Sequence, residues 1–266
     1  GIQGKLLPNS LRNMSGIFHN GKVSHSADDF LPVHRCSGMN LQTHHLQVPR
    51  TARYVTLGEM GPQTRELWFA YHGYGMLAQR FIHKFIKLAD QNPEVVVVAP
   101  EGLSRFYLGD NVFEHVGATW MTKDERAHEI QDQQTYLNSI YDQIMERMDR
   151  QAVRVFHLGF SQGVATVWRW LNQQPQVQAD GMVLWAGMPP QQGELLQARH
   201  RQGMPVHLAW GDQDPFINAE RIEQVRGVLH GLELTVQEHP FEGDHRVVPD
   251  LLLDIRQELV TQAATA

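Results

Sequence analysis

The chain has 266 residues, of which 42% are hydrophobic and 20% are charged, a globular composition that excludes a disordered or fibrous protein. Its 23 Lys and Arg residues against 29 Asp and Glu residues give a net charge of -6, which argues against nucleic acid as a partner. No stretch approaches the roughly 18 consecutive apolar residues of a membrane-spanning helix. Cys36 is the only cysteine, so an internal disulfide is excluded. We therefore expect a cytoplasmic protein, and a removed signal peptide stays open as the alternative because the sequence starts at Gly1 without Met.

The first forty residues differ from the rest of the chain. Residues 1–40 are polar and aperiodic and are predicted to be an N-terminal extension. One tight hairpin is expected there, since Asn20-Gly21 lies between short apolar flanks. Two extended segments follow, Leu41 to Val48 and Tyr54 to Leu57, and their position on either side of Pro49 predicts an antiparallel hairpin.

Beyond this hairpin, apolar runs alternate with helical patterns, which is typical of the strand-helix units of a parallel sheet. Five runs predict strands that are buried on both faces: Leu67 to Tyr71, Val95 to Ala99, Val153 to Leu158, Met182 to Trp185 and Val206 to Trp210. Helices are expected between them, and the last two over about Ala219 to Leu229 and Pro249 to Leu259. No linker or repeat interrupts the series. Residues 41–266 are therefore predicted to form one α/β domain, with a mostly parallel central sheet, an antiparallel N-terminal hairpin and helices on both faces.

The sequence Gly159-Phe160-Ser161-Gln162-Gly163 lies where a predicted strand meets a predicted helix. Such a turn strains the backbone of its central residue and brings the residues two before and two after it against other backbone, where glycine fits best. Gly159 and Gly163 meet this demand. We therefore expect the hydroxyl of Ser161 to be a nucleophile at the C-terminal edge of the sheet, with the N–H of Gln162 as a donor to an oxyanion.

A serine nucleophile needs a base and usually an acid that orients the base. Asp212 and Asp214 follow the predicted strand that ends at Trp210, and both are candidates for the acid; initiating the turn is the alternative role for either. His245 follows the last predicted strand, Leu234 to His239, and is the candidate base. The chain order Ser, Asp, His is that of α/β-hydrolases.

The loop His72-Gly73-Tyr74-Gly75-Met76 follows a predicted strand and is expected to supply the second oxyanion donor. His72 is interpreted as a structural hydrogen-bonding residue. The segment Ser104 to Trp120 is predicted to be a long loop whose aromatic residues can line a pocket, with packing onto the body of the protein as the alternative. The candidate substrate-binding residues are Trp120, Phe106, Met76 and Phe216.

Together these motifs resemble the phospholipase/carboxylesterase family of α/β-hydrolases, which includes the acyl-protein thioesterases. The resemblance rests on Tyr71 to Gly75, Ala99-Pro100, Trp120, Gly159 to Gly163, Gly211 to Pro215 and Gly243 to His245. It covers roughly residues 67 to 266, and Gly-Phe-Ser-Gln-Gly is its most specific piece. The resemblance implies a triad of Ser161, Asp214 and His245, and an oxyanion hole made by the backbone N–H groups of Tyr74 and Gln162.

Two positions depart from the pattern of the family. Phe216-Ile217 follows Pro215 where the family usually has Val-Pro, which keeps Asp212 open as the alternative acid. Asp244 directly precedes His245, and we interpret it as a solvated turn residue, with tuning of the base as the alternative.

The 15 histidines raise the question of a metal site. His44 and His45, considered with His34 and Cys36, lack the spacing of a zinc motif, and neighbouring residues of a strand point to opposite faces. We therefore predict no metal and no organic cofactor. The expected activity is that of a serine carboxylesterase acting on small-molecule carboxylic esters. A thioesterase or lysophospholipase with the same triad is one alternative, and a non-catalytic binding module with a hydrolase fold is another.

Overall fold

The computed structural model of the chain describes residues 41–109, 114–190, 201, 203–232 and 234–263. The chain divides into two units, Gly1–Pro49 and Arg50–Ala266, and all the helices and strands named below belong to the second. In the first unit, residues 41–49 are exposed and have no regular secondary structure. The extension over residues 1–40 and the hairpin expected at Asn20-Gly21 lie outside the described residues.

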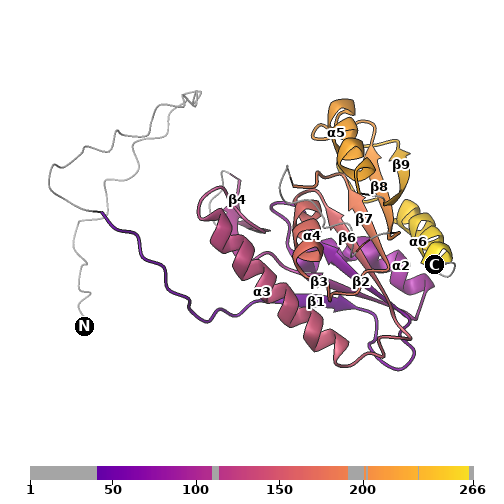
Figure 1. The fold of residues 1–266 in the computed structure, drawn as a ribbon, viewed down its shortest axis with the longest axis horizontal. Coiled ribbons are helices and arrows are strands. Elements are labelled where there is room, and N and C mark those ends of the chain that lie inside the picture. Colours follow the sequence, from indigo (N-terminus) through magenta and orange to yellow (C-terminus); the bar gives the residue numbers. More distant parts are fainter. Residues whose placement is uncertain (1–40, 110–113, 191–200, 202, 233, 264–266) are drawn as a thin grey trace, which may run out of the picture. The chain divides into compact units, whose positions relative to one another are not determined.

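Strands and helices alternate along the second unit (Figure 1). In chain order the elements are β1 (Tyr54–Leu57), β2 (Glu66–Tyr71), α1 (Ala78–Phe81), the 3-10 helix η1 (Ile82–Phe85), α2 (Ile86–Gln91), β3 (Val95–Pro100), β4 (Ser104–Leu108), β5 (His115–Thr119), α3 (Arg126–Met145), β6 (Arg154–Phe160), α4 (Gln162–Gln173), β7 (Gly181–Trp185), β8 (Pro205–Gly211), α5 (Ala219–His230), β9 (Thr235–Phe241) and α6 (Pro249–Ala263).

Seven strands form the central sheet in the order β1-β3-β2-β6-β7-β8-β9. Every neighbouring pair is parallel except β1 with β3. The five apolar runs of the sequence are confirmed as β2, β3, β6, β7 and β8, and nearly all of their residues are buried. Because the strands are parallel, their C-terminal ends meet at one edge, where sheets of this kind assemble their sites.

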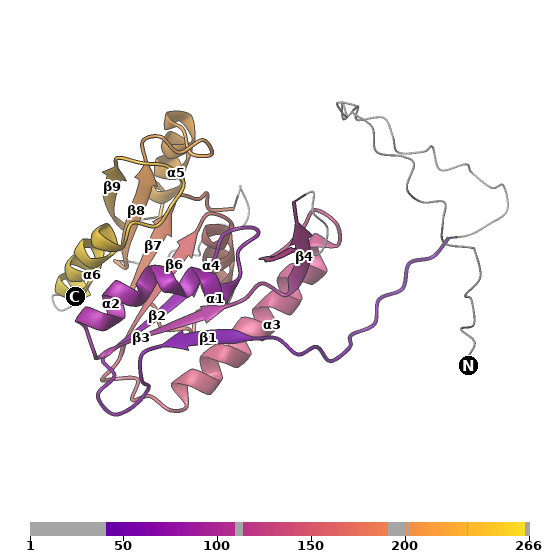
Figure 2. The ribbon, with the colours of Figure 1, turned by 180° about the vertical axis from the view of Figure 1, so that it is seen from behind.

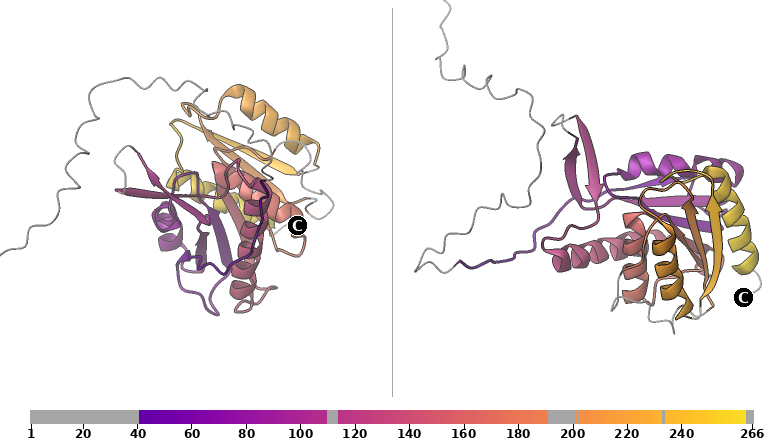
Figure 3. Two further views of the ribbon diagram at one scale, coloured as in Figure 1. Left: turned by 90° about the vertical axis from the view of Figure 1, so that its left-hand side faces the viewer. Right: turned by 90° about the horizontal axis from the view of Figure 1, so that it is seen from above.

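Helices cover both faces of this sheet (Figures 2 and 3). Apolar residues of α3, α4 and α5 pack against one face, and those of α1, α2 and α6 pack against the other. Large aromatic rings fill the first layer, where Trp170 of α4 meets Tyr141 of α3 edge to face at 5.8 Å between ring centroids. Truncating a buried ring of this size to Ala typically costs about 3–5 kcal/mol, so each face contributes strongly to stability.

The start of the sheet differs from the predicted hairpin. The strand Tyr54–Leu57 is present and antiparallel, but its partner is β3, and the predicted strand over Leu41 to Val48 is wrong. Leu41 and Val48 are 93% and 68% exposed, so the apolar residues of that segment gain no burial that would hold it as a strand.

Glu101, the residue after β3, forms hydrogen bonds with three segments near the start of the sheet. Its buried carboxylate accepts two hydrogen bonds of 2.9 Å from Arg53 and one of 2.7 Å from Arg105. Burial alone would raise the pKa of Glu101, but the hydrogen bonds from the two guanidinium groups lower it below its ordinary value. The same carboxylate accepts the backbone N–H of Ala78, so it connects the residue that precedes β1 with β4 and α1.

The segment Ser104 to Trp120 is not the predicted loop. It contains the antiparallel pair β4 and β5, which forms a second, two-stranded sheet. Residues of β4 alternate between half-buried and exposed, as the two faces of a strand do. This alternation was missed because the whole segment was interpreted as one long loop. Gly75 donates its N–H to Ala118 O at 2.9 Å, which attaches this hairpin to the loop after β2.

Candidate active site

Ser161 occupies the turn between β6 and α4. Its backbone has φ 54° and ψ -116°, a conformation that a residue with a side chain rarely adopts. A Cβ on Gly159 would lie 2.6 Å from Gly163 O, and a Cβ on Gly163 would lie 2.1 Å from Tyr71 O. The steric demand predicted for both glycines is therefore present. Ser161 also donates its N–H to Trp185 O at 2.9 Å, which fixes the turn against β7.

His245 and Asp214 meet beyond the C-terminal ends of β8 and β9. His245 Nδ1–H donates to Asp214 Oδ2 at 2.6 Å, and the Asp214 side chain is fully buried. Asp214 Oδ1 accepts the backbone N–H groups of Phe216 and Ile217 at 2.8 and 3.2 Å. The carboxylate is therefore held by its own turn on one oxygen and presents the other to the imidazole ring.

Two aromatic rings and Asp212 also lie around His245 or its loop. The His245 ring lies 4.8 Å from the Phe160 ring and 4.9 Å from the Phe216 ring, which it meets edge to face. Asp212 is exposed and accepts the N–H of Gly243 at 2.9 Å, so it braces the loop that carries His245 without touching the ring. Within the described residues, Asp214 is the candidate acid that forms a hydrogen bond with His245, and Asp212 forms none with it.

The loop after β2 lies against the serine. A Cβ on Gly73 would meet Ser161 Cβ at 3.2 Å. His72 Nδ1–H donates to Gly73 O at 2.8 Å, and His72 Nε2 accepts the N–H of Gly102 at 2.9 Å. In a trans peptide the C=O and the following N–H point in opposite directions, so the bond from His72 turns the N–H of Tyr74 away from the His72 ring.

His72 itself is unsuited to proton transfer. It is fully buried and stacks on Trp120 at 4.8 Å between ring centroids. Burial lowers its pKa to about 4, although the hydrogen bond to Gly73 opposes the shift, so the ring is neutral at pH 7. Both ring nitrogens are engaged by backbone groups. This geometry matches the structural role expected for His72.

Gln162 is the first residue of α4, where the backbone N–H groups have no partner within the helix. Its side chain amide exchanges hydrogen bonds with Thr119 Oγ1 and contacts Met121 O and the N–H of Trp120, at 2.8 to 3.1 Å. These contacts fasten the start of α4 to the end of β5. The sequence showed the position of the Gln162 backbone but not this role of its side chain.

A cavity of about 300 Å³ opens beside Ser161 and His245. Besides Ser161 and His245, it is lined by Gly73, Tyr74, Met76, Phe81, Lys84, Phe160, Arg246 and Val247. Met76 therefore lies where a substrate-binding residue is expected. The other three candidates lie outside the lining: Trp120 is buried and donates Nε1–H to His72 O, Phe106 contacts the Tyr74 ring in a tilted arrangement, and Phe216 meets the His245 ring edge to face.

Sequence reasoning missed several residues of this lining. Phe81 and Lys84 come from α1 and η1, and Val247 follows the base in the chain. Phe81 and Phe85 are four residues apart, and this helical spacing of apolar residues is the one local signal for Phe81.

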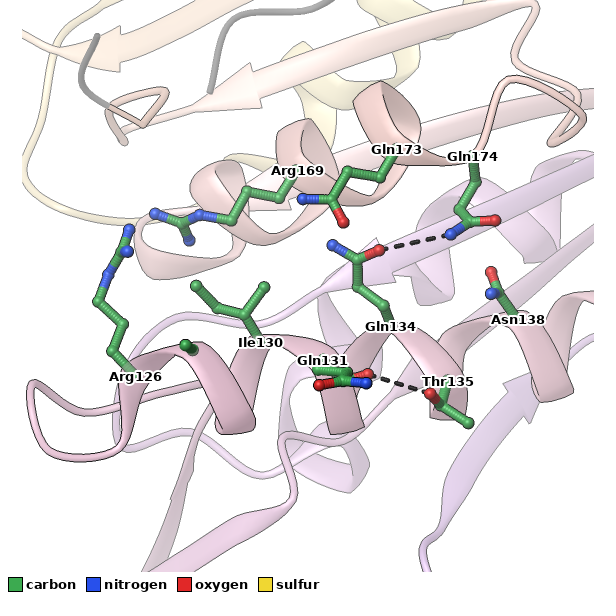
Figure 4. Close-up of a pocket in the computed structure, with 10 residues that line it drawn as sticks. Arg126, Ile130, Gln131, Gln134, Thr135, Asn138, Arg169, Gln173 and Gln174 are labelled. Carbon is green, nitrogen blue, oxygen red and sulfur yellow. Dashed lines mark hydrogen bonds between the residues drawn. The ribbon is translucent and has the colours of Figure 1, made fainter. Parts of the chain in front are cut away.

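A second, larger cavity of about 410 Å³ lies between α3 and α4 (Figure 4). It is lined mainly by amide side chains, with Arg126 and Arg169 at one end. None of the predicted site residues belongs to it. Ser161 and His245 both line the smaller cavity, so size alone does not identify the site.

Comparisons with known proteins agree with this architecture. Residues 62–262 match the sequence profile of the phospholipase/carboxylesterase family. A carboxylesterase of Bacillus cereus superposes with a TM-score of 0.59 at 16% identity, over 79% of this chain and 94% of its own. Acyl-protein thioesterase 2 of Zea mays superposes with a TM-score of 0.58 at 13% identity, over 80% of this chain and all (100%) of its own. Among curated proteins, none matches this sequence.

The sheet order, the helices on both faces and these structural neighbours identify the fold as that of the α/β-hydrolases, as predicted. Within the described residues, none of the helices combines the length and the apolar character that crossing a membrane requires.

Proposed function

Because the chain belongs to the phospholipase/carboxylesterase family, we propose that it is a serine carboxylesterase that hydrolyses carboxylic esters through a covalent acyl-enzyme. The observation that carries the proposal is the 2.6 Å hydrogen bond from His245 to the buried Asp214, beside a cavity that His245 and Ser161 both line. In this assignment Ser161 is the nucleophile, His245 the general base and Asp214 the acid.

The hydrogen bond to Asp214 determines which nitrogen of His245 acts. With the proton of Nδ1 held by the carboxylate, Nε2 carries the lone pair and accepts the proton of the Ser161 hydroxyl. Serine oxygen then bonds to the ester carbonyl carbon, and His245 returns the proton to the leaving alcohol. Water attacks the acyl-serine by the same route and releases the acid, with His245 again taking and returning the proton. No hydrogen bond joins Ser161 and His245 within the described residues, and such bonds often tighten only when substrate is bound.

The backbone N–H groups of Tyr74 and Gln162 are proposed to hold the oxyanion of both tetrahedral intermediates. The first is supported by the His72 bond to Gly73 O, which orients the next peptide, and the second by its place at the start of α4. Loss of one such donor in a serine hydrolase typically lowers kcat about 10²- to 10³-fold. The surrounding hydrogen bonds of His72 and Gln162 keep both donors in position before the charge develops.

The cavity supports a small acyl group. Its volume of about 300 Å³ is at the lower end for ligand pockets, and Met76, Phe81, Phe160 and Val247 give it an apolar wall. We therefore expect short-chain p-nitrophenyl esters to be hydrolysed with a higher kcat/KM than long-chain ones. A thioester of the same acid would pass through the same acyl-enzyme, so a paired ester and thioester separate a carboxylesterase from a thioesterase.

A fluorophosphonate probe tests the proposed mechanism. It is expected to label the folded wild-type protein at Ser161 and to abolish ester turnover, because the activated hydroxyl attacks phosphorus as it attacks a carbonyl. Ser161→Ala is expected to lose labelling and to lower kcat by about 10⁶-fold. The matched control is Ser139→Ala on the exposed side of α3, which should behave as wild type. A wild-type protein that is folded, unlabelled and inactive on all esters would support the binding module instead.

A further inference from the structure

A cluster of polar side chains joins β8, β9 and α6 and takes no part in the proposed reaction. His207, His239 and Glu258 form its centre. His207 Nδ1 lies 2.8 Å from His239 Nε2, and Glu258 Oε2 lies 3.6 Å from each of these nitrogens. We propose that these three side chains bind a divalent transition-metal ion, with Zn²⁺ as the fitting representative.

The separations between the three atoms suit zinc. A tetrahedral Zn²⁺ with bonds of 2.0 to 2.1 Å has its ligand atoms about 3.3 to 3.4 Å apart. The distances in the structure, 2.8 Å between the two imidazole nitrogens and 3.6 Å from each nitrogen to the carboxylate oxygen, lie on either side of this value. The three atoms reach the tetrahedral spacing if the two rings move slightly apart and the carboxylate moves slightly closer to them. Imidazole and carboxylate are accepted ligands of Zn²⁺, and two histidines with one glutamate leave the fourth position to water. The Glu258 side chain is 42% exposed, so water and the ion can reach the cluster.

The tautomer of His207 is already that of a metal ligand. His207 Nε2 lies 3.2 Å from Gln262 Oε1, and an amide oxygen only accepts, so Nε2 carries the proton and Nδ1 carries the lone pair. Histidines that bind metals generally donate their second N–H to such a partner. In the structure His207 Nδ1 accepts the N–H of His239 Nε2. Metal binding requires this proton to move through solvent to His239 Nδ1, which leaves both rings neutral and releases no net proton.

The surroundings of the cluster also favour a cation. Asp254, one turn before Glu258 on α6, is close enough to His239 to act on it electrostatically. Gln237 lies opposite His207 in the ladder of β8 and β9, and its Oε1 is buried with no hydrogen-bond partner among the described residues. An unpaired buried acceptor is destabilising, and a metal-bound water is a donor of the kind it lacks.

The proposed metal site is separate from the catalytic one. His207 precedes the last residue of β8 by four positions, about 13 Å along the strand, whereas Asp214 lies beyond that end. A metal held by both strands and by α6 would tie the helix to β9, the edge strand of the sheet (Figure 2). The expected role is therefore to stabilise this edge.

Titration of the full chain with Zn²⁺ in a calorimeter tests the proposal, with His239→Gln and Glu258→Gln as the decisive variants. Each is expected to weaken the tight site by at least about 100-fold in Kd, because a ligand is lost. Gln262→Leu, which leaves the three ligands, is expected to weaken it by about 10- to 100-fold. Co²⁺ in place of Zn²⁺ should give the visible absorption of a tetrahedral site in the wild type and lose it in His239→Gln.

His128→Gln is the matched control, because His128 also pairs with a glutamate, Glu125, but lies on α3. It should bind Zn²⁺ within about threefold of wild type, and all variants should show the circular dichroism of the folded protein. The proposal is overturned if the wild type has no tight site, or if the folded His239→Gln and Glu258→Gln variants bind Zn²⁺ as the wild type does. A site lost in His128→Gln instead would equally refute it.

Discussion

Replacing Asp214 by Asn is expected to stop ester turnover by reversing the tautomer of His245. Asp214 Oδ1 accepts two backbone N–H groups, at 2.8 and 3.2 Å, so the oxygen of an asparagine amide must take that position. The amide nitrogen then faces His245 Nδ1 in place of Oδ2. Because that nitrogen only donates, Nδ1 becomes an acceptor and the ring proton moves to Nε2, the nitrogen proposed to accept the proton of Ser161. The proposed base can then no longer accept a proton at Nε2, although the side chains keep their positions.

The same change in a Ser-His-Asp protease lowers kcat about 10⁴-fold, which corresponds to about 5 kcal/mol at about 1.4 kcal/mol per factor of ten. We expect a loss of this size in kcat for p-nitrophenyl acetate. Asp212→Asn is the matched variant. Its amide oxygen can still accept the N–H of Gly243, so only the strength of one exposed hydrogen bond changes, by about 1 kcal/mol or a factor of about five.

The assay is steady-state hydrolysis of p-nitrophenyl acetate by both variants at pH 7.5, with thermal melts to show that both are folded. The reasoning is refuted if Asp214→Asn retains turnover within tenfold of wild type. It is also refuted if Asp212→Asn loses as much as Asp214→Asn, because the acid would then be Asp212 or the loop geometry would dominate.

Three further outcomes follow from the packing. Gly163→Ala is expected to unfold the protein or to lower its free energy of unfolding by more than about 3 kcal/mol in a urea titration, because the new Cβ would lie 2.1 Å from backbone. Gly227→Ala, in open space on α5, should instead raise that free energy by about 0.5–1 kcal/mol, and equal effects of the two variants would contradict this. Burial lowers the pKa of His72 to about 4 and that of His157 to about 3, so the unfolded chain binds more protons between these values and pH 6.5. As the pH falls from about 6.5, stability should decrease by up to about 1.4 kcal/mol per pH unit for each ring, down to about pH 4 for His72 and about pH 3 for His157. A folded His157→Gln variant with the same pH slope would refute the assignment. Trp120→Phe removes the donor to His72 O and should lower kcat equally for short and long acyl esters, whereas a chain-length dependence would place Trp120 in the acyl pocket.

The local sequence was sufficient to predict those elements whose backbone geometry is determined by a single segment of the chain. The buried strands appear as apolar runs because both faces of a parallel sheet are covered, and the turn at Ser161 requires its glycines wherever a strand reverses into a helix. The same reasoning failed for Leu41 to Val48. A strand exists only when another pairs with it, and nothing local reveals that β1 pairs with β3.

The lining of the cavity beside Ser161 and His245 depends on contacts between distant segments. Lys84 and Val247 reach it from η1 and from the loop after β9, and neither position has a local signature. Trp120 was predicted from its aromatic character, but its direction depends on the β4–β5 hairpin, which turns it onto His72. The cluster of His207, His239 and Glu258 likewise forms only when α6 packs beside β8 and β9. Residue type therefore indicated which side chains can act, while tertiary packing decided where they act.

His72 and His245 illustrate this difference within one residue type. Both follow strands of the same sheet, and both donate Nδ1–H to an oxygen, at 2.8 and 2.6 Å. For His72 that oxygen is a backbone carbonyl and Nε2 accepts a backbone N–H, so the ring has no nitrogen free for proton transfer. For His245 the oxygen belongs to the Asp214 carboxylate, which in the proposed reaction stabilises the imidazolium formed when Nε2 takes a proton. The partner of Nδ1 and the access to Nε2, rather than the histidine itself, thus separate a side chain that orients a peptide from one that can act as a base.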